Sequence, residues 1–330
     1  MSSLTIRGRT LREALVLSPM VDVTDAAFRS LAREHGADVT CSEMIAAVGL
    51  VAGRPRAWED CAPAVGESPY GVQFMTANPE EIADAVRQLG ARFPEVDFVD
   101  VNLGCPAPNI LRSCAGGFLM RDPAQAAKVV AAARKAADDV GIPHVSAKMR
   151  LGPDSDHLTY LDVGKAVEAA GADWVTLHAR TVEQGYSGEA DWSHIAKLVR
   201  GVGVPVLGNG DVRIPADVVR MRDETDCAGF FIARAAMRDP TCFERMRRAL
   251  QGQDPGPEPA MAERLGTLAE YLGRAATVGV TIGELRRIAT RFVVGERGAA
   301  RLRAKLNGAP DAETLRSFVL EAQAVLQAAA

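Results

Sequence analysis

One cysteine stands where a thiol could transfer a proton. Cys105 lies in the segment DVNLGCPAPN, between Gly104 and Pro106, in a tight loop directly beyond a predicted strand over 98–103. A thiol in such a loop can act as a general acid toward a carbon centre. The alternative is a buried structural role, because free cysteines are among the most buried residues. Cys114, further along the same loop, is a second, weaker candidate.

Other polar side chains stand near the ends of predicted strands: Gln73, Lys148 and His178. The Gln73 amide could satisfy both the donor and the acceptors of a flavin pyrimidine edge, and Lys148 could stabilise the charge of a reduced flavin. A salt bridge to Glu43 or Asp100 is the alternative for Lys148. His178 is either a donor to a phosphate or substrate, or a hydrogen-bonded core residue.

Two loops near the end of this series have small residues. They read GNGDV (208–212) and ARAAM (233–237), and Arg234 could meet a phosphate there. In α/β barrels the last two loops frequently bind phosphate through backbone N–H groups. The alternative is that Gly208 and Gly210 only form a tight turn. The sequence has no metal-ligand spacing, G-x-S-x-G elbow or dinucleotide fingerprint, so we expect an organic cofactor and no metal.

The elements that must position these residues alternate between apolar runs and helical patterns. The strands are expected at 14–20, 39–44, 70–75, 98–103, 144–150, 174–180, 204–210 and 228–234. The helices are expected at 24–35, 79–89, 123–138, 160–170, 192–200, 215–223 and 240–251. Continuous apolar strands are typical of parallel sheets that are buried on both faces. Eight such strands in about 240 residues predict a (β/α)8 TIM barrel, whereas a doubly wound sheet usually stops at five or six.

Three helices have a start signal, in which a capping residue precedes a proline at the first helical position. These signals are Asn78-Pro79, Asp122-Pro123 and Asp239-Pro240. The connection over 45–69 has no clear pattern. We expect a barrel domain over 1–251, a linker with the sequence GQDPGPEPA around 252–260, and a small helical domain over 261–330.

Composition narrows the classes of protein further. The chain has 330 residues, 48% hydrophobic and 24% charged, with a net charge of −4, which excludes a disordered or fibrous chain. No apolar stretch approaches the ~18 residues of a membrane span, and the first residues lack the apolar core of a secretory signal. Six cysteines without a C-x-x-C pair fit a reducing compartment, so we expect a cytoplasmic location.

Basic residues are concentrated near the C-terminus. Between 283 and 308 there are seven Arg and Lys against two Glu, and Arg245, Arg247 and Arg248 precede the linker. This segment is either an electrostatic footprint for RNA or a solvated helical face. Given the resemblance described next, we favour RNA.

Taken together, these segments resemble the tRNA-dihydrouridine synthases, flavoproteins that reduce a uridine of transfer RNA. The resemblance covers 14–251 and, less closely, the tail. It is carried by LSPMVDVTDAAFR (17–29), YGVQFM (70–75), DVNLGCPAPN (100–109), AGGFLM (115–120), SAKMRLG (146–152), TLHARTVEQGYSG (176–188), GNGDV (208–212) and GFFIARAAM (229–237). The chain departs from the family pattern at Ser18 and Ala233, where other small residues are usual, and at Ile288, Arg291 and Val293.

The resemblance implies FMN as cofactor and assigns residues to it in groups. Those that contact the flavin ring, its pyrimidine edge and its phosphate are Ser18, Pro19, Met20, Gln73, Lys148, His178, Asn209, Gly210, Asp211, Ala233 and Arg234. It also implies substrate and RNA contacts by Asn102, Arg180, Tyr186, Arg286, Arg287 and Arg291.

The same resemblance implies a reaction. A hydride passes from flavin N5 to C6 of the uracil while Cys105 donates a proton to C5, with NADPH as the electron donor and tRNA as the partner. We expect a monomer. Two alternatives remain: a flavin barrel that acts on a free pyrimidine, such as dihydroorotate or a dihydropyrimidine, and a non-catalytic RNA-binding protein.

Overall fold

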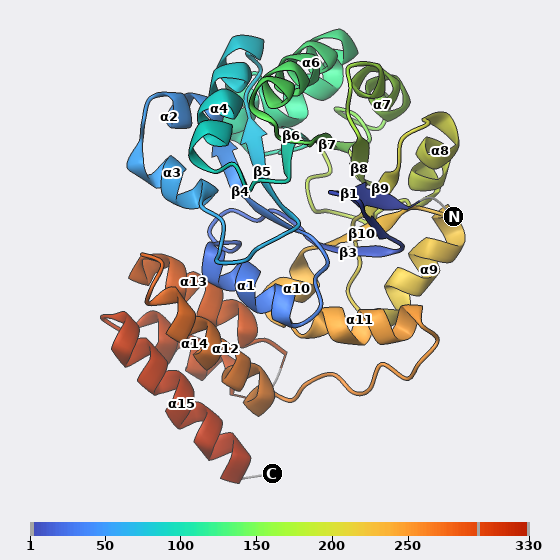
Figure 1. Ribbon diagram of the computed structural model, residues 1–330. Helices are drawn as coiled ribbons and strands as arrows, with labels where there is room; N and C mark the ends of the chain where they lie inside the picture. The colour runs from blue at the N-terminus through green and yellow to red at the C-terminus, as the bar shows by residue number, and fades with distance from the viewer. Residues whose placement is uncertain (1–2, 296–297, 329–330) are drawn as a thin grey trace.

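The computed structural model describes residues 3–295 and 298–328, and its centre is a parallel barrel (Figure 1). The strands are β3 (Ala14–Leu17), β4 (Thr40–Ala46), β5 (Tyr70–Met75), β6 (Phe98–Leu103), β7 (His144–Arg150), β8 (Trp174–His178), β9 (Val206–Asn209) and β10 (Gly229–Ile232). They pair in parallel in the order β3-β10-β9-β8-β7-β6-β5-β4. A bridge between Val16 and Val39 joins the two edges. The predicted (β/α)8 TIM barrel with C-terminal helices is therefore confirmed.

Alternation along the strands points one set of side chains into the barrel and the other set toward the outer helices. In β6, Val99, Val101 and Leu103 belong to the large core that includes the outer helices, whereas Phe98 packs in a smaller cluster with Trp174. Asp100 and Asn102 follow Phe98 at the same period of two and make hydrogen bonds with side chains of β5 and β7. The barrel interior thus changes from apolar to polar toward the carboxyl ends of the strands.

The predicted helices around the barrel are present, with ends shifted by one to three residues. They are α1 (Ala26–Glu34), α4 (Pro79–Arg92), α6 (Pro123–Val140), α7 (Tyr160–Ala169), α8 (Ser193–Gly201), α9 (Pro215–Thr225) and α11 (Cys242–Leu250). Asn78 and Asp122 cap α4 and α6 as predicted. The start predicted at Asp239-Pro240 is wrong: α11 begins at Cys242, and Asp239 instead binds Thr241 and Arg245.

Several expected strands end earlier than predicted. The runs over 14–20, 174–180, 204–210 and 228–234 leave the sheet at Leu17, His178, Asn209 and Ile232. Their last residues pass into the loops at the carboxyl end of the barrel. The region 45–69 forms α2 (Ala47–Val51) and α3 (Pro55–Cys61), and the loops also contain α5 (Pro108–Arg112), the 3-10 helix η1 (Gly116–Arg121) and α10 (Arg234–Arg238).

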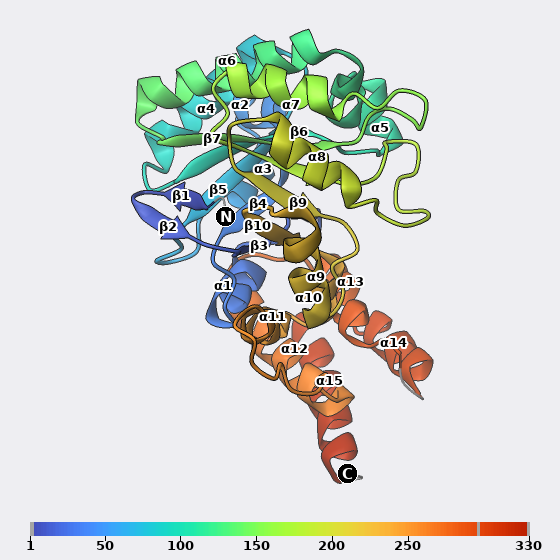
Figure 2. The same cartoon turned by 90° about the vertical axis from the view of Figure 1, so that its right-hand side faces the viewer.

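An antiparallel hairpin, which the sequence analysis did not predict, covers the amino end of the barrel. It consists of β1 (Leu4–Ile6) and β2 (Arg9–Leu11), joined by Arg7 and Gly8 with φ of 46° and 72°. Leu4 and Ile6 are buried in the cluster that contains Phe98 and Trp174. Figure 2 shows the hairpin on one side of the barrel and α5 on the opposite side.

Helices also form the C-terminal part of the chain. They are α12 (Met261–Ala275), α13 (Ile282–Phe292), α14 (Ala299–Asn307) and α15 (Ala312–Ala328). Tyr271 of α12 packs edge-on against Phe28 of α1 and donates to Asp25, the N-cap of that helix, at 2.7 Å. This part therefore has an apolar and hydrogen-bonded contact with the barrel beside α1, at the lower left of Figure 1.

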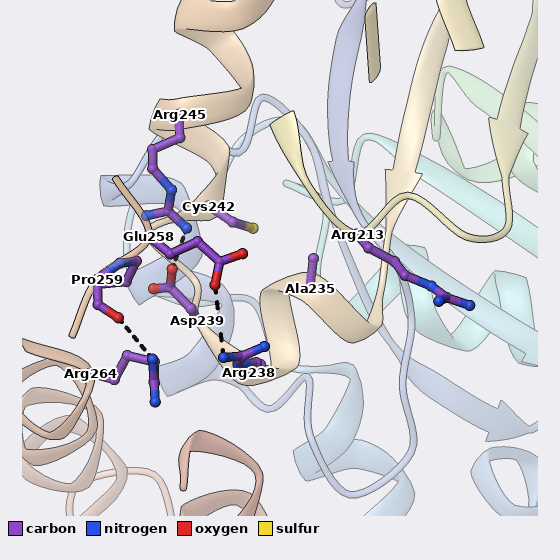
Figure 3. A pocket seen from close by; sticks show the side chains of 9 residues that line it. All are labelled: Arg213, Ala235, Arg238, Asp239, Cys242, Arg245, Glu258, Pro259 and Arg264. Carbon is purple, nitrogen blue, oxygen red and sulfur yellow. Dashed lines mark hydrogen bonds and ion pairs between the residues drawn. The ribbon is translucent and has the colours of Figure 1, made fainter. Parts of the chain in front are cut away.

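The segment between α11 and α12 contacts an arginine of α10 on the barrel side and an arginine of α12 (Figure 3). Arg264 donates to the Pro259 carbonyl at 2.8 Å, and Arg238 lies 3.8 Å from Glu258. These side chains border a hollow of about 40 Å³. That volume holds only a few water molecules. We therefore interpret the hollow as a gap in the packing and not as a ligand site.

Candidate functional site

A cavity of about 960 Å³ opens at the carboxyl ends of the barrel strands. Of the residues predicted for a site, it is lined by Ser18, Pro19, Met20, Gln73, Asn102, Cys105, Lys148, His178, Tyr186, Asn209, Gly210, Asp211, Ala233, Arg234, Arg287 and Arg291. The structure thus brings residues from seven strand ends and the C-terminal helices to one place. Arg180, Arg286 and Cys114 do not line it.

A chain of side-chain hydrogen bonds connects the floor of this cavity to Cys105. Asp100 accepts from Ser146 at 2.5 Å and from Gln73 Nε2 at 2.7 Å. Gln73 Oε1 then accepts from Asn102 Nδ2 at 2.9 Å, and Asn102 Oδ1 accepts from the Cys105 backbone N–H at 2.9 Å. Because an ionised carboxylate can only accept, Asp100 orients both amides. Burial raises the pKa of Asp100, an effect that its hydrogen bonds oppose.

The Cys105 loop is closely packed by two glycines. The Cys105 carbonyl accepts from the Gly117 N–H at 3.0 Å. A Cβ at Gly116 would lie 3.1 Å from the Cys105 Cβ, and Gly116 also has φ of 58°. Only glycine adopts this close, left-handed conformation without strain. The AGGFLM segment therefore supports the position of the partly buried thiol.

Lys148 has no ionic partner within the described residues. The two carboxylates considered as its partners have other contacts: Asp100 accepts from Gln73 and Ser146, and Glu43 accepts from the Asp22 N–H at 2.7 Å. The Lys148 Nζ lies 6.0 Å from the centre of the Phe231 ring. Burial, assisted by the nearby Arg150, lowers the pKa of Lys148 to about 8. The side chain is thus available to a ligand in the cavity.

Arg150 connects two loops of the cavity and was not among the predicted site residues. It comes at the end of β7, beside His178 in the parallel register. Its Nε donates to the Gly104 carbonyl at 2.8 Å, and its Nη1 donates to the carbonyls of Thr181 and Gly185 at 2.9 and 2.7 Å. Arg150 thereby ties the loop of the thiol to the loop that carries Tyr186.

Arg180 is buried, so its guanidinium does not reach the rim where the sequence analysis expected an RNA contact. It donates to Asp211 at 2.6 Å and to the carbonyls of Ser187 and Gly188 at 3.1 and 2.7 Å. Asp211 also pairs with Arg234 at 2.7 Å. Burial raises the pKa of Asp211, but the Ala190 N–H and Arg180 outweigh this effect and lower it to about 2. Asp211 is therefore ionised, and its carboxylate holds the Arg234 guanidinium at the cavity by an ion pair.

His178 is neutral in this environment. Burial and the positive charges of Arg150, Lys148, Arg180 and Arg234 lower the pKa of His178 well below its usual value. Arg180 Nη1 lies 3.3 Å from His178 Nε2, and a guanidinium has no acceptor. Nε2 therefore accepts, and the neutral ring has its proton on Nδ1, where it can serve as a donor.

Basic and aromatic side chains lie at the rim of the cavity. Tyr186 is 66% exposed, and the Arg150 and Arg234 guanidinium carbons lie 5.6 and 6.0 Å from its ring centre. Arg287 and Arg291 of α13 are exposed and also line the cavity. Over the whole cavity, Lys148 and four arginines line the wall together with two aspartates, Asp22 and Asp211. This charge balance favours an anionic ligand.

The rest of the basic segment is used differently. Arg286 and Arg303 donate to the Ala309 and Val293 carbonyls at 2.8 and 2.9 Å, and Lys305 pairs with Glu321 at 2.7 Å. Before the linker, Arg245 and Arg247 pair with Asp239 and Asp38, while Arg248 is exposed. Arg297 and Glu296 lie outside the described residues. Much of this charge is therefore engaged within the protein.

Within residues 3–295 and 298–328, no group of three or more His, Cys, Asp or Glu could hold a metal ion. In the same part of the chain, no helix is long and apolar enough to cross a membrane.

The fold and the site define an α/β-barrel protein whose cavity is built at the strand ends from amides, a lysine and a thiol. The family model described as Dihydrouridine synthase (Dus) matches residues 16–330. The chain belongs to the dihydrouridine synthase family.

Similar proteins cover most of the chain. A "Probable tRNA-dihydrouridine synthase" of Aquifex aeolicus is 32% identical over 94% of this chain and 92% of its own length. One of Mycobacterium tuberculosis is 37% identical over 81% of this chain and 69% of its own. The "tRNA-dihydrouridine synthase B" of Pseudomonas aeruginosa is 31% identical over 98% of both chains. The family-model match, which extends to residue 330, includes the C-terminal helices.

Solved structures show similarity in fold alone. The 6-hydroxypseudooxynicotine amine oxidase of Pseudomonas geniculata N1 has a TM-score of 0.55 at 16% identity, covering 81% of this chain and 52% of that one. A 2-naphthoyl-CoA reductase complex has a TM-score of 0.51 at 13% identity, covering 76% and 52%.

Proposed function

We propose that this protein reduces the C5=C6 bond of a uridine in tRNA to 5,6-dihydrouridine, with FMN as cofactor and NADPH as electron donor. The observation that carries the proposal is the common cavity of Cys105, Asn102, Gln73 and Lys148. It supports the proposal because a proton donor, amides suited to pyrimidine edges and a cation lie together. The names of the similar proteins agree with this reaction.

The residues of the cavity fit FMN. A volume of about 960 Å³ is at the upper end of small-molecule sites and leaves room for a second planar group. Ser18, Pro19 and Met20 would lie along the flavin ring, with Gln73 and the unpaired Lys148 at its pyrimidine edge. The phosphate would be held by the loops that contain Asn209, Gly210, Ala233 and Arg234, with His178 near them.

The side chain of Asp211 was predicted to contact the phosphate, but here it would instead orient Arg234. Its carboxylate would repel a phosphate, but it orients Arg234 at 2.7 Å. A guanidinium held in place loses less freedom when it binds a dianion. Asp211 would therefore act on the phosphate through Arg234.

Bound flavin would supply the hydride for C6 of the uracil. Cys105 would hold the proton at Sγ and donate it to C5. Lys148 and Arg150 are near enough that a negative charge on Cys105 raises their pKa values, and these cations would stabilise the thiolate left after the transfer. Asn102, fixed between Gln73 and the Cys105 loop, would orient the uracil.

The C-terminal helices would bind the RNA around the target base. Drawing the base out of its stacked position costs about a few kcal/mol, which phosphate contacts would offset. Tyr186 at the rim offers a face on which a base can stack. We accordingly assign cofactor binding and catalysis to 1–251, a linker to 252–260 and RNA binding to 261–330.

Mass spectrometry of tRNA tests the proposal. A strain that lacks this gene should contain uridines without the two-dalton gain, and expression of the wild-type gene, but not of Cys105→Ala, should restore it. The purified protein should be yellow and should bind FMN. Turnover of free uracil or orotate with none on tRNA would instead identify a free-pyrimidine enzyme. Full complementation by Cys105→Ala would support a non-catalytic RNA-binding role.

A further inference from the structure

One short segment serves both the cavity and the C-terminal helices. Residues Ser18 to Val23 line the cavity. Asp22 of this stretch and Asp25, two residues beyond it, contact the tail, here defined as α12 to α15. The placement of the tail and the shape of the cavity wall therefore depend on the same backbone.

Asp22 is held from the barrel side. Its backbone N–H donates to Oε2 of Glu43, a buried residue of β4, at 2.7 Å. Asp22 also has φ of 61°, a conformation that non-glycine residues adopt rarely and that surrounding contacts must maintain. The carboxylate Oδ1 of Asp22 lies 3.1 Å from Arg287 Nη2 of α13.

Two further polar contacts join the same parts of the molecule. Tyr271 of α12 donates to Asp25 at 2.7 Å. Arg56 of α3 pairs with Glu284 of α13 at 2.7 Å and with Asp60 at 2.9 Å. Glu284 and Arg287 are three residues apart, so α13 is held at neighbouring positions of one face.

Arg291 lies on this face one turn beyond Arg287, and its environment differs. It lines the cavity and is exposed, and it has no ion pair within residues 3–295 and 298–328. Arg287, by contrast, has its charge directed at Asp22. The two arginines therefore differ in their contacts: Arg287 pairs with Asp22, whereas the Arg291 guanidinium is available to a ligand.

We propose that Asp22 is a positioning residue: through Arg287 it sets the placement of α13 at the cavity, so that Arg291 is presented to the phosphate backbone of a bound RNA. Arg287 is accordingly a docking residue and not a phosphate contact. The docking part stands on the contacts alone, whereas the RNA part rests on the proposed function.

A charge exchange in the full-length protein tests the docking part without any RNA. In hydrogen-exchange measurements, Asp22→Arg and Arg287→Asp should each raise the exchange of α13 amides by about fivefold, because each places like charges together. The double variant should return exchange close to the wild-type rate. The matched control is Arg291→Asp on the same helix face. Adding Asp22→Arg to this variant should not slow the exchange of α13 amides. Equal exchange in all variants, or a double variant as mobile as the singles, would overturn the docking role.

Salt dependence tests the RNA part. With a tRNA transcript as the probe, Arg291→Gln should lower the slope of log affinity against log salt by about one, whereas Arg287→Gln should weaken binding and leave the slope unchanged. A slope lowered by Arg287→Gln would show that this residue contacts phosphate and would overturn the assignment. If the wild-type protein binds tRNA without forming dihydrouridine, the proposed reaction fails while both measurements still decide the present inference.

Discussion

Methionine in place of Arg150 keeps most of the apolar stem of the side chain and removes the guanidinium with its donors. Three carbonyls, of Gly104, Thr181 and Gly185, lose a charged partner at 2.7–2.9 Å in a largely buried position. A hydrogen bond to a charged group contributes about 1.5–3 kcal/mol. Some of the carbonyls can recruit water, so we expect a loss of about 3 kcal/mol in the ordering of the two loops.

This loss should appear mainly in catalysis. About 3 kcal/mol corresponds to roughly a hundredfold lower kcat/KM for tRNA, because the loop of Cys105 is no longer tied to the loop of Tyr186. Flavin content should be retained, and Tm should fall by about 5 °C. Arg150→Lys should recover only part of the activity, since one ammonium cannot span three carbonyls.

Steady-state kinetics on a tRNA transcript, flavin absorbance and thermal melting measure these effects. The control is Arg87→Met, which removes an exposed guanidinium on the outer helix α4 and should leave kcat/KM unchanged. An Arg150→Met variant with wild-type kcat/KM and Tm would refute the reasoning that this arginine organises the two loops.

Cys105→Ala should keep bound flavin but lower dihydrouridine formation by about a hundredfold or more; unchanged turnover would contradict its role as the acid. Because the pKa of Lys148 is about 8, its charge is present at pH 7 and largely lost at pH 9. Uptake of FMN by deflavinated protein should weaken about tenfold over that range, and a titration in which Lys148→Arg behaves like wild type would remove this explanation. With a pKa of about 2, Asp211 stabilises the fold above its unfolded pKa near 3.8, and this stability is lost as the pH falls toward 2. Asp211→Asn should lower the free energy of unfolding at pH 7 by about 1–2 kcal/mol after solvent screening; an unchanged denaturation midpoint would contradict this.

The barrel could be predicted because its strands are buried on both faces and read as apolar runs. The same property misplaced their ends: in ALVLSPM, the residues after Leu17 are still apolar because they line the cavity, although they have left the sheet. The hairpin over 4–11 was not predicted, although the sequence contains a hairpin pattern there. Leu4 and Ile6 alternate with polar residues before Arg7 and Gly8, whose positive φ values form the kind of two-residue turn that closes hairpins.

Side chains that point into the barrel at strand ends were found in the sequence because their polarity interrupts an apolar run, as with Gln73 and Lys148. The functions of Arg150, Arg180 and Asp100 could not be predicted from the sequence, because they depend on partners that are distant along the chain. Arg180 looks like a rim residue until Asp211 and the carbonyls of Ser187 and Gly188 are brought around it. Burial of a charge is a property of the assembled loops and leaves no local pattern.

The hairpin at the amino end has a consequence for the order of events. Leu4 and Ile6 fill the end of the barrel where Phe98 and Trp174 also pack, so, in the described chain, exchange with solvent proceeds through the opposite mouth. If the proposed function holds, the cofactor bound deep in the barrel and the RNA bound at its open end would both enter through this one opening. The ligand that binds deepest would then have to bind first and dissociate last, so that the two ligands would bind in a fixed order.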